Sequence, residues 1–287
     1  MFPTPSPRDR KILELTSKVT IASRRQYQWF HEGDQKDRQM RRSCERLSRR
    51  GLLRRSSPVY VDPLSNSAAY VYSSTENGLY VLAEQLGDPS VLLCPHSPPE
   101  TTLVRHEILV TEVQLTLMKA VEAETDVELL RPLRRGHIIN PEEPDEAKHR
   151  TFTFDLSNGK PLFCEPDFAF ELKYHSARVG FCMELETGSN GAKRKIARCH
   201  QGYAALADES QQRFVELFPE VTKGPFLVLV VAPTPGYRDA MRKAIAGKPA
   251  AHLWRFATFR DLSPQSFLFE PIWYRHDVKE PVTLLNR

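Results

Sequence analysis

The chain has 287 residues, of which 40% are hydrophobic and 26% charged, with a net charge of +4. This is the composition of an ordinary soluble globular protein, long enough for one large domain or two of usual size. The longest apolar run, Phe226–Ala232, is far shorter than the roughly 20 residues that span a bilayer, and no apolar signal region begins the sequence. We therefore expect a cytoplasmic protein without a membrane partner. The five cysteines are scattered and form no Cys-x-x-Cys pair, which argues against a disulfide framework and a structural zinc site.

Positive charge is concentrated near the start of the chain. Residues 1–55 hold 15 of the 40 Lys and Arg but 6 of the 36 Asp and Glu, a net charge of +9, whereas the remainder carries −5. Such asymmetry is typical of a nucleic-acid-binding segment joined to another domain.

The basic region is predicted to fold into three helices, over Arg8–Thr16, Ser23–Phe30 and Asp34–Arg50. In the third, apolar residues from Met40 to Leu47 recur at helical spacing. Cations fill most of its other positions: Lys36, Arg38, Arg41, Arg42, Arg46, Arg49 and Arg50. Seven cations are more than ion pairs with acidic residues of the same helix can neutralise. We therefore expect them to contact phosphate groups. The alternative is an Arg-rich, solvated helix on a small helical domain.

A hairpin with strands Val59–Asp62 and Ala69–Ser73 and a helix over Thr75–Leu86 are predicted next. Two phrases, Cys44-Glu45-Arg46-Leu47-x-x-x-Gly51-Leu52-Leu53 and Tyr70-x-Tyr72-x-x-Thr75-x-x-Gly78, accompany this order. Order and phrases resemble the winged helix-turn-helix family, whose last helix lies in the major groove and whose wing reaches the backbone. The resemblance implies double-stranded DNA as the partner. The expected DNA-binding residues are Lys36, Arg38, Arg41, Arg42, Arg46, Arg49, Arg50, Arg54 and Arg55.

A connector rich in proline and serine follows, so we place a linker there. The predicted limits are a DNA-binding domain over residues 1–88, a linker over 89–100 and a second domain over 101–287.

The second domain is predicted to be mixed α/β, because helical and strand patterns alternate along it. In chain order the expected elements are a long amphipathic helix Thr102–Glu122, a strand Thr151–Asp155, two hairpin strands between residues 161 and 186, a helix Ala192–Leu206, a strand Phe226–Ala232, a helix Tyr237–Ile245 and a strand Leu253–Phe259.

The hairpin turns at Tyr174–Ala177, and its polarity alternates with a period of two residues. Folding it symmetrically predicts one continuous apolar face, with cross-strand pairs Phe168–Met183, Phe170–Phe181 and Leu172–Val179. The other face would pair Asp167 with Glu184 and Glu165 with Glu186. Carboxylates about 5 Å apart repel by roughly 3 kcal/mol at an effective dielectric of about 20. A divalent cation or a shared proton between them makes the arrangement useful. The alternative is a solvated strand face that is acidic by chance.

From residue 102 to 259 the element order resembles the PD-(D/E)xK nuclease-like core, a restriction-endonuclease-like mixed sheet. Pro166-Asp167 is similar to its first motif, and Glu184-Leu185-Glu186 stands where its acid-x-lysine motif belongs. With the preceding winged helix, the whole chain resembles the replication-relaxation family of plasmid and mobile-element proteins. Lys195-Ile196 also fits that family's core phrase.

The resemblance implies Mg²⁺ or Mn²⁺ held by Asp167 and Glu184, beside the Leu185 carbonyl, with Glu107 as a further acid. The lysine of the motif is replaced by Glu186, so Lys193 or Lys195 would have to reach in from the next helix. The expected catalytic residues are Asp167, Glu184, Glu186 and Lys195.

Two functions are consistent with these patterns. The first is a DNA-binding protein of a plasmid or mobile element with a metal-dependent DNA nicking or cleaving domain. The alternative is a non-catalytic accessory factor or transcriptional regulator, whose degenerate nuclease-like domain serves homodimer formation or protein contacts. A nucleotide cofactor is not expected, because the sequence has no Walker or dinucleotide motif, and a Gly-x-Ser-x-Gly elbow is also absent.

Overall fold

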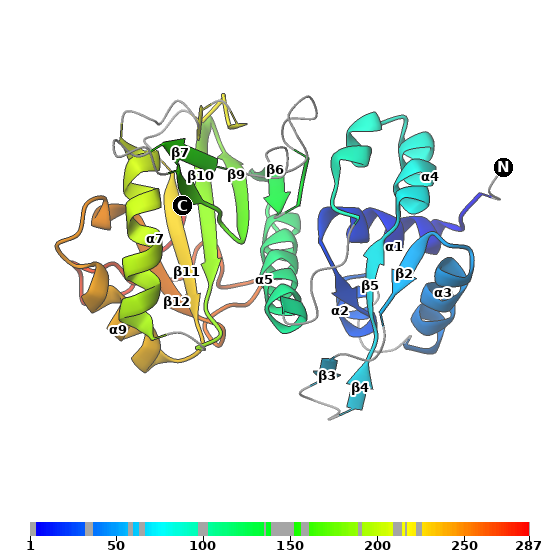
Figure 1. Ribbon diagram of the computed structural model, residues 1–287, viewed down its shortest axis with the longest axis horizontal. Helices are drawn as coiled ribbons and strands as arrows, with labels where there is room; N and C mark the ends of the chain where they lie inside the picture. The colour runs from blue at the N-terminus through cyan, green and yellow to red at the C-terminus, as the bar shows by residue number, and fades with distance from the viewer. Residues whose placement is uncertain are drawn as a thin grey trace. The chain divides into compact units, whose positions relative to one another are not determined.

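A computed structural model (Figure 1) describes residues 4–286 except 32–36, 57–59, 63–66, 97–102, 135, 139–151, 156–160, 189–190, 209–213, 216 and 222–225. The chain divides into two compact units. The first comprises Met1–Leu115 with Arg134–His149, and the second Thr116–Leu133 with Arg150–Arg287. The long helix α5 (Val104–Glu122) contributes residues to both units. The mixed α/β fold class predicted from the sequence is confirmed, whereas the domain limits at 89–100 stay a prediction.

The first unit begins with helices and continues with short antiparallel strands. Its elements are α1 (Pro7–Lys18), β1 (Ala22–Ser23), α2 (Arg24–His31), α3 (Asp37–Arg49), β2 (Leu53–Arg55), β3 (Tyr60–Asp62), β4 (Ser67–Ala69), β5 (Val71–Ser74), α4 (Glu76–Leu86), the 3-10 turn η2 (Pro89–Leu93) and the start of α5. Strands β1, β5 and β2 form one sheet in that order, and β3 pairs with β4 in a separate hairpin. The order of helices, basic helix and hairpin is the one predicted.

The apolar stripe predicted on α3 forms part of the core. Met40, Cys44 and Leu47 are fully buried, as is Ile12 of α1. Because these positions recur every three to four residues, burying them turns the opposite face of α3 outward. The arginines of α3 are thereby placed on the surface.

The phrase Thr75-x-x-Gly78 has a physical explanation in this fold. The Thr75 hydroxyl accepts a hydrogen bond from the Gly78 amide (3.0 Å), which caps α4, and donates to the Gly51 carbonyl (2.7 Å). A Cβ atom on Gly78 would lie 2.1 Å from the Leu52 carbonyl oxygen. The start of α4 can therefore pack this closely against residues 51 and 52 only when position 78 is glycine.

The second unit is built on a five-stranded mixed sheet in the order β12-β11-β10-β9-β6. Strands β9 and β10 are antiparallel, and β10, β11 and β12 are parallel. Its elements are the end of α5, β6 (Val127–Arg134), β7 (Phe152–Asp155), β8 (Pro161–Cys164), β9 (Phe168–Tyr174), β10 (Ala177–Leu185), α7 (Ala192–Ala207), β11 (Leu227–Ala232), α9 (Pro235–Ile245), the 3-10 turn η4 (Ala251–Leu253) and β12 (Trp254–Thr258).

The register predicted for the hairpin is confirmed. Phe168 pairs with Met183 and Phe170 with Phe181, and all four are fully buried. The Phe170 ring stacks on those of Phe168 and Phe181, with centroids 4.9 and 5.0 Å away. The apolar face exists as expected.

Two details differ from the expected strands. The predicted long strand is broken, because β8 ends at Cys164 and pairs with β7 outside the main sheet, while β9 begins at Phe168. Pro166, which has no backbone N–H to donate to a ladder, stands at the break. The fifth sheet strand is β6, a segment for which we predicted no strand.

The second face of the sheet, which carries Asp167 and Glu184, is covered by helices α7 and α9, which pack beside each other (Figure 1). One core cluster joins strand residues such as Ala169 and Cys182 to helix residues such as Ile196 and Met241. A fully solvated acidic face is therefore wrong for this protein, because Asp167, Glu184 and Glu186 are buried.

Candidate functional site

Three of the four residues predicted to be catalytic are in direct contact. Lys195 lies in the first turn of α7, and its side chain is buried against the sheet. Its Nζ atom is 2.7 Å from Glu184 Oε2 and 3.2 Å from Glu186 Oε1. Lys193, the other candidate for this position, is exposed. The ammonium group therefore reaches the carboxylates from the helix that follows the hairpin.

Asp167, the fourth predicted residue, is placed by the backbone of β10. Its Oδ2 atom accepts a hydrogen bond from the Leu185 amide (2.8 Å), and its own amide donates to the Met183 carbonyl (3.0 Å). These bonds set Asp167 beside Glu184 on the helix-covered face. Glu165, expected to pair with Glu186, is exposed, whereas Glu186 is buried.

Two tyrosines that the sequence analysis did not single out complete the group. The Tyr203 hydroxyl donates to Glu184 Oε1 (2.5 Å), and the Tyr237 hydroxyl donates to Glu186 Oε2 (3.1 Å). Tyr203 lies about two helical turns after Lys195, so its spacing on α7 is a signal that could have revealed it. Tyr237 comes from α9, and nothing local in the sequence connects it with Glu186.

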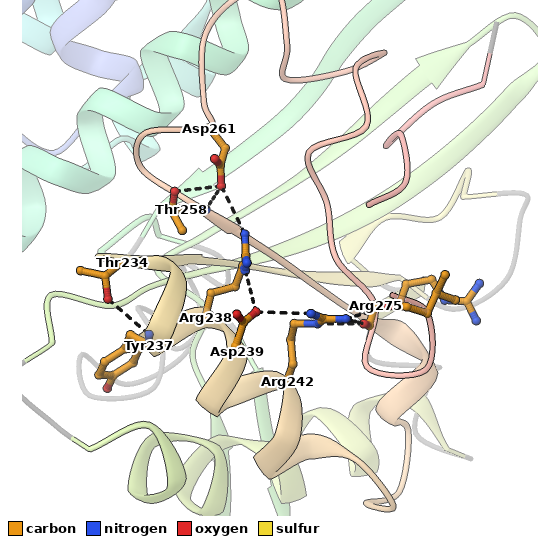
Figure 2. Close-up of polar contacts among 9 residues, drawn as sticks. Thr234, Tyr237, Arg238, Asp239, Arg242, Thr258, Asp261 and Arg275 are labelled. Atoms are coloured by element: carbon orange, nitrogen blue, oxygen red, sulfur yellow. Dashed lines mark hydrogen bonds and ion pairs between the residues drawn. The ribbon is translucent and has the colours of Figure 1, made fainter. Parts of the chain in front are cut away.

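Polar contacts hold both ends of α9, as Figure 2 shows. The Thr234 hydroxyl caps the helix by accepting from the Tyr237 amide (3.2 Å), and Arg242 donates to the Arg275 carbonyl (2.8 Å). Arg238 lies over the Tyr274 ring at 3.8 Å from its centroid. The Thr234 cap lies at the helix end from which the Tyr237 hydroxyl reaches Glu186.

The electrostatics of the group reflect an excess of buried negative charge. Burial raises the pKa of Glu184, the charge of Asp167 raises it further, and Lys195 opposes both. Burial acts to lower the pKa of Lys195, but attraction to Glu184 and Asp167 raises it above its usual value. Lys195 is therefore charged at neutral pH. Among the described residues of this group, one ammonium faces the buried carboxyl groups of Asp167, Glu184 and Glu186.

The donor set suits a hard divalent cation by its chemistry, since carboxylate oxygens are what Mg²⁺ and Mn²⁺ prefer. The excess negative charge also favours a further cation. However, the described residues contain no group of three or more His, Cys, Asp or Glu positioned to hold a metal. Both carboxylate oxygens of Glu184 already have protein partners. Metal binding by Asp167 and Glu184 therefore stays a prediction.

Glu107, expected as a further acid, is engaged elsewhere. It forms a buried ion pair with Arg134 in the first unit, at 2.6 Å. Arg134 also donates to Gln114 on the next turns of α5 (2.9 Å). The described contacts of Glu107 thus give it a structural partner.

A second candidate site is the basic surface of α3 and β2 in the first unit. One hollow of about 530 Å³ is lined by Arg42, Arg46, Arg49 and Arg50. Another, of about 510 Å³, is lined by Glu45, Ser48, Arg49, Leu53, Arg54 and Arg55. Arg38, Arg41, Arg42, Arg46, Arg49, Arg54 and Arg55 are all exposed, and Lys36 lies outside the described residues.

The arginines of this surface have different partners. Arg46 makes two hydrogen bonds to Asp9, which is 1% exposed, at 2.6 and 3.1 Å. It therefore ties α3 to α1 as well as lining the hollow. Arg41 donates to Glu45 one turn later (2.9 Å), and Arg55 lies over the half-exposed Tyr70 ring at 4.6 Å.

Fold and sites together define a mixed α/β protein with an arginine-rich surface in one unit and a buried carboxylate–lysine group in the other. The chain belongs to the replication-relaxation family, which matches residues 13–221. Membership connects it with the replication of plasmids and other mobile elements. Strand β11, helix α9 and strand β12 lie beyond the matched residues, so Tyr237 comes from outside that range.

Comparisons with curated proteins and with solved structures found no match. Among the described residues, no helix has the length and apolar character needed to cross a membrane.

Proposed function

We propose that this replication-relaxation protein binds double-stranded DNA through α3 and β2 of the first unit, in the replication of a plasmid or mobile element. The observation that carries the proposal is the row of exposed arginines bordering two adjoining hollows on these elements. Guanidinium groups bind phosphate in a bidentate manner, and displacing counterions from DNA drives such binding. The order of helices and hairpin, similar to a winged helix, supports insertion of α3 into the major groove.

The test is the binding of labelled duplex DNA between 50 and 200 mM salt, measured by fluorescence anisotropy. We expect affinity to fall steeply with salt, and Arg42→Ala and Arg49→Ala each to weaken binding about tenfold and to reduce the salt slope by about 1. Lys248→Ala, an exposed cation of the second unit, is the matched control and should leave binding unchanged. Binding that is insensitive to both arginines would refute the assignment of this surface.

A second function is favoured by the position of Lys195. We infer that the carboxylate–lysine group cleaves phosphodiesters, because an ammonium lies between Glu184 and Glu186 although the acid-x-lysine lysine is missing from the strand. Asp167 and Glu184 would hold Mg²⁺ or Mn²⁺, which when bound activates water and screens charge on phosphate. Lys195 holds Glu184 and Glu186 in place and offers positive charge to the phosphate. Tyr203 fixes the orientation of the Glu184 carboxylate.

Cleavage is tested with supercoiled plasmid in Mg²⁺ and then Mn²⁺, comparing the wild type with Asp167→Ala and Glu184→Ala. Relaxed or linear product from the wild type, and from neither alanine variant, supports a metal-dependent nuclease at this group. Glu165→Gln is the control, because this exposed carboxylate lies two residues from Asp167. Cleavage that survives both alanine substitutions would place the activity elsewhere.

The alternative is a non-catalytic accessory factor or transcriptional regulator, whose second unit mediates homodimer formation or protein contacts. It is favoured by one observation: both Glu184 oxygens already have protein partners. If the wild type and both variants bind DNA equally and none cuts, this function leads. Sedimentation analysis of the full chain then tests whether it forms a homodimer.

A further inference from the structure

A carboxylate stands in the middle of the basic surface. Glu45 lies on α3, one turn after Arg41 and one turn before Arg49, and its side chain is about one third exposed (32%). It lines the hollow between α3 and β2 together with Arg54 and Arg55. A negative group is thus built into the surface that we expect to face a polyanion.

The contacts of Glu45 leave part of its carboxylate available. Oε1 accepts a hydrogen bond from Arg41 Nε at 2.9 Å. Within the part of the chain that the structure describes, no hydrogen bond reaches Oε2. The hydrogen bond from Arg41 lowers the pKa of Glu45, and the charges of Arg41, Arg49 and Arg55 add to this effect. At neutral pH the group is therefore an ionised acceptor.

An ionised acceptor at this place weakens contact with the DNA backbone, because it repels phosphate. It can be satisfied only by a donor, and the major groove offers donors only as the amino groups of cytosine N4 and adenine N6. On adenine the acceptor N7 stands next to the amino group and would face the second carboxylate oxygen. Guanine presents two acceptors and thymine one, so both repel the group. Cytosine is therefore the base whose edge suits Glu45.

We propose that Glu45 is a specificity-determining residue, which accepts a hydrogen bond from the N4 amino group of a cytosine in the major groove. The proposal rests on the proposed DNA binding by α3. The carboxylate lowers affinity for DNA in general and restores it where a cytosine meets the hollow. Selectivity at one base position is the result.

The competing role is purely structural: Glu45 would only orient Arg41, and Arg41 would contact the DNA. The two roles are separable because the bond between them can be removed from either side. Glu45→Gln removes the charge and keeps the size of the side chain. Arg41→Met removes the hydrogen-bond donor and leaves the Glu45 carboxylate on the helix.

The experiment is selection of bound duplexes from a library of random sequence, carried out with the full-length wild type, Glu45→Gln and Arg41→Met. Glu84→Gln, an exposed carboxylate on α4 of the same unit, is the control for loss of one negative charge. We expect the wild type and Glu84→Gln to enrich cytosine at one position by about tenfold over other bases. Glu45→Gln should lose that preference alone, while binding random duplex several-fold more tightly. Arg41→Met should keep it.

Three outcomes overturn the proposal while leaving DNA binding by α3 intact. They are an unchanged base preference in Glu45→Gln, loss of the same cytosine preference in Arg41→Met, and a wild type that binds duplex DNA without base preference. A wild type that binds no duplex DNA at any salt concentration refutes the proposed function itself, and the base-reading role with it.

Discussion

Two helices of this protein look alike in sequence and differ in what their cations do. Helix α3 of the first unit carries arginines along most of its length, and α7 of the second unit carries four Lys and Arg in its first two turns. On α3 the described arginines are exposed, although Arg46 also donates hydrogen bonds to the buried Asp9. On α7, Lys193 and Arg194 are exposed, but Lys195 is buried against Glu184. The same sequence signal therefore serves a surface in one unit and an interior group in the other.

The difference follows from what lies opposite each helix. The buried face of α3 packs on apolar side chains, so its arginines point into water. A charged side chain that stays hydrated adds little free-energy cost to folding. The first turn of α7 packs on a strand face that carries carboxylates, and a buried carboxylate needs a partner. Exposed cations are thus available to another molecule, whereas Lys195 is tied to the stability of its own unit. Substitutions that separate these roles test the comparison.

The largest effect is expected for Lys195→Met. Removing one partner of a buried ion pair leaves the other charge uncompensated, which typically costs about 3–5 kcal/mol. Urea denaturation of the variant should show a loss of that size in the free energy of unfolding of the second unit. Lys193→Met is the control, because its exposed side chain should change stability by less than about 0.5 kcal/mol. Equal effects at the two positions would contradict the inward position of Lys195.

A smaller effect is expected for Arg46→Ala, the α3 substitution that should behave as if it were in the interior. The variant leaves the buried Asp9 carboxylate without its two guanidinium bonds. Because Arg46 itself is nearly half exposed (45%), we expect a loss of about 1–2 kcal/mol rather than the full cost of a buried pair. Arg42→Ala, on the same helix, should leave the free energy of unfolding unchanged in the same denaturation experiment. If both variants are equally stable, the hydrogen bonds between Arg46 and Asp9 contribute nothing to the free energy of unfolding.

The pH dependence of stability provides a third test. The pKa of Glu184 is raised in the folded protein, so the folded state binds this proton more tightly than the unfolded state. Stability should therefore fall as pH rises from the unfolded value near 4.3 towards the raised pKa, by at most about 1.4 kcal/mol per pH unit for one proton. Glu184→Gln should lose this slope. Denaturation curves of both proteins at several pH values between 4 and 8 measure it, and parallel pH profiles would contradict the raised pKa.

Much of this fold could be predicted because its signals are local. Alternating polarity between Phe168 and Met183 predicted the hairpin and its register, and the spacing from Met40 to Leu47 predicted the buried stripe of α3. Strand β6 was missed for a local reason as well: it contains Pro132, a residue that argues against a strand, and its burial does not alternate.

The candidate site was only partly predictable, because its completion depends on contacts across the fold. Asp167 and Glu184 follow from the hairpin register, which the sequence contains. The choice of Lys195 over Lys193 depends on which face of α7 meets the sheet. The link from Tyr237 to Glu186 joins residues 51 positions apart, and no pattern in either segment indicates it.

The smallest effect is expected for Tyr237→Phe, which tests whether a residue beyond the family-matched range belongs to the group. The substitution removes one donor from Glu186 and leaves the Lys195 contact in place, so the loss of stability should be about 1 kcal/mol or less. Burial, followed by the nearby charge of Glu186, raises the pKa of Tyr237 to about 12, so the hydroxyl is protonated and donates at every pH from 6 to 9. The difference from the wild type should therefore be constant over that interval. A difference that changes with pH in that range would contradict a Tyr237 hydroxyl that stays protonated. Tyr203→Phe, which leaves the buried Glu184 carboxylate without its shortest bond, should cost more and serves as the internal comparison.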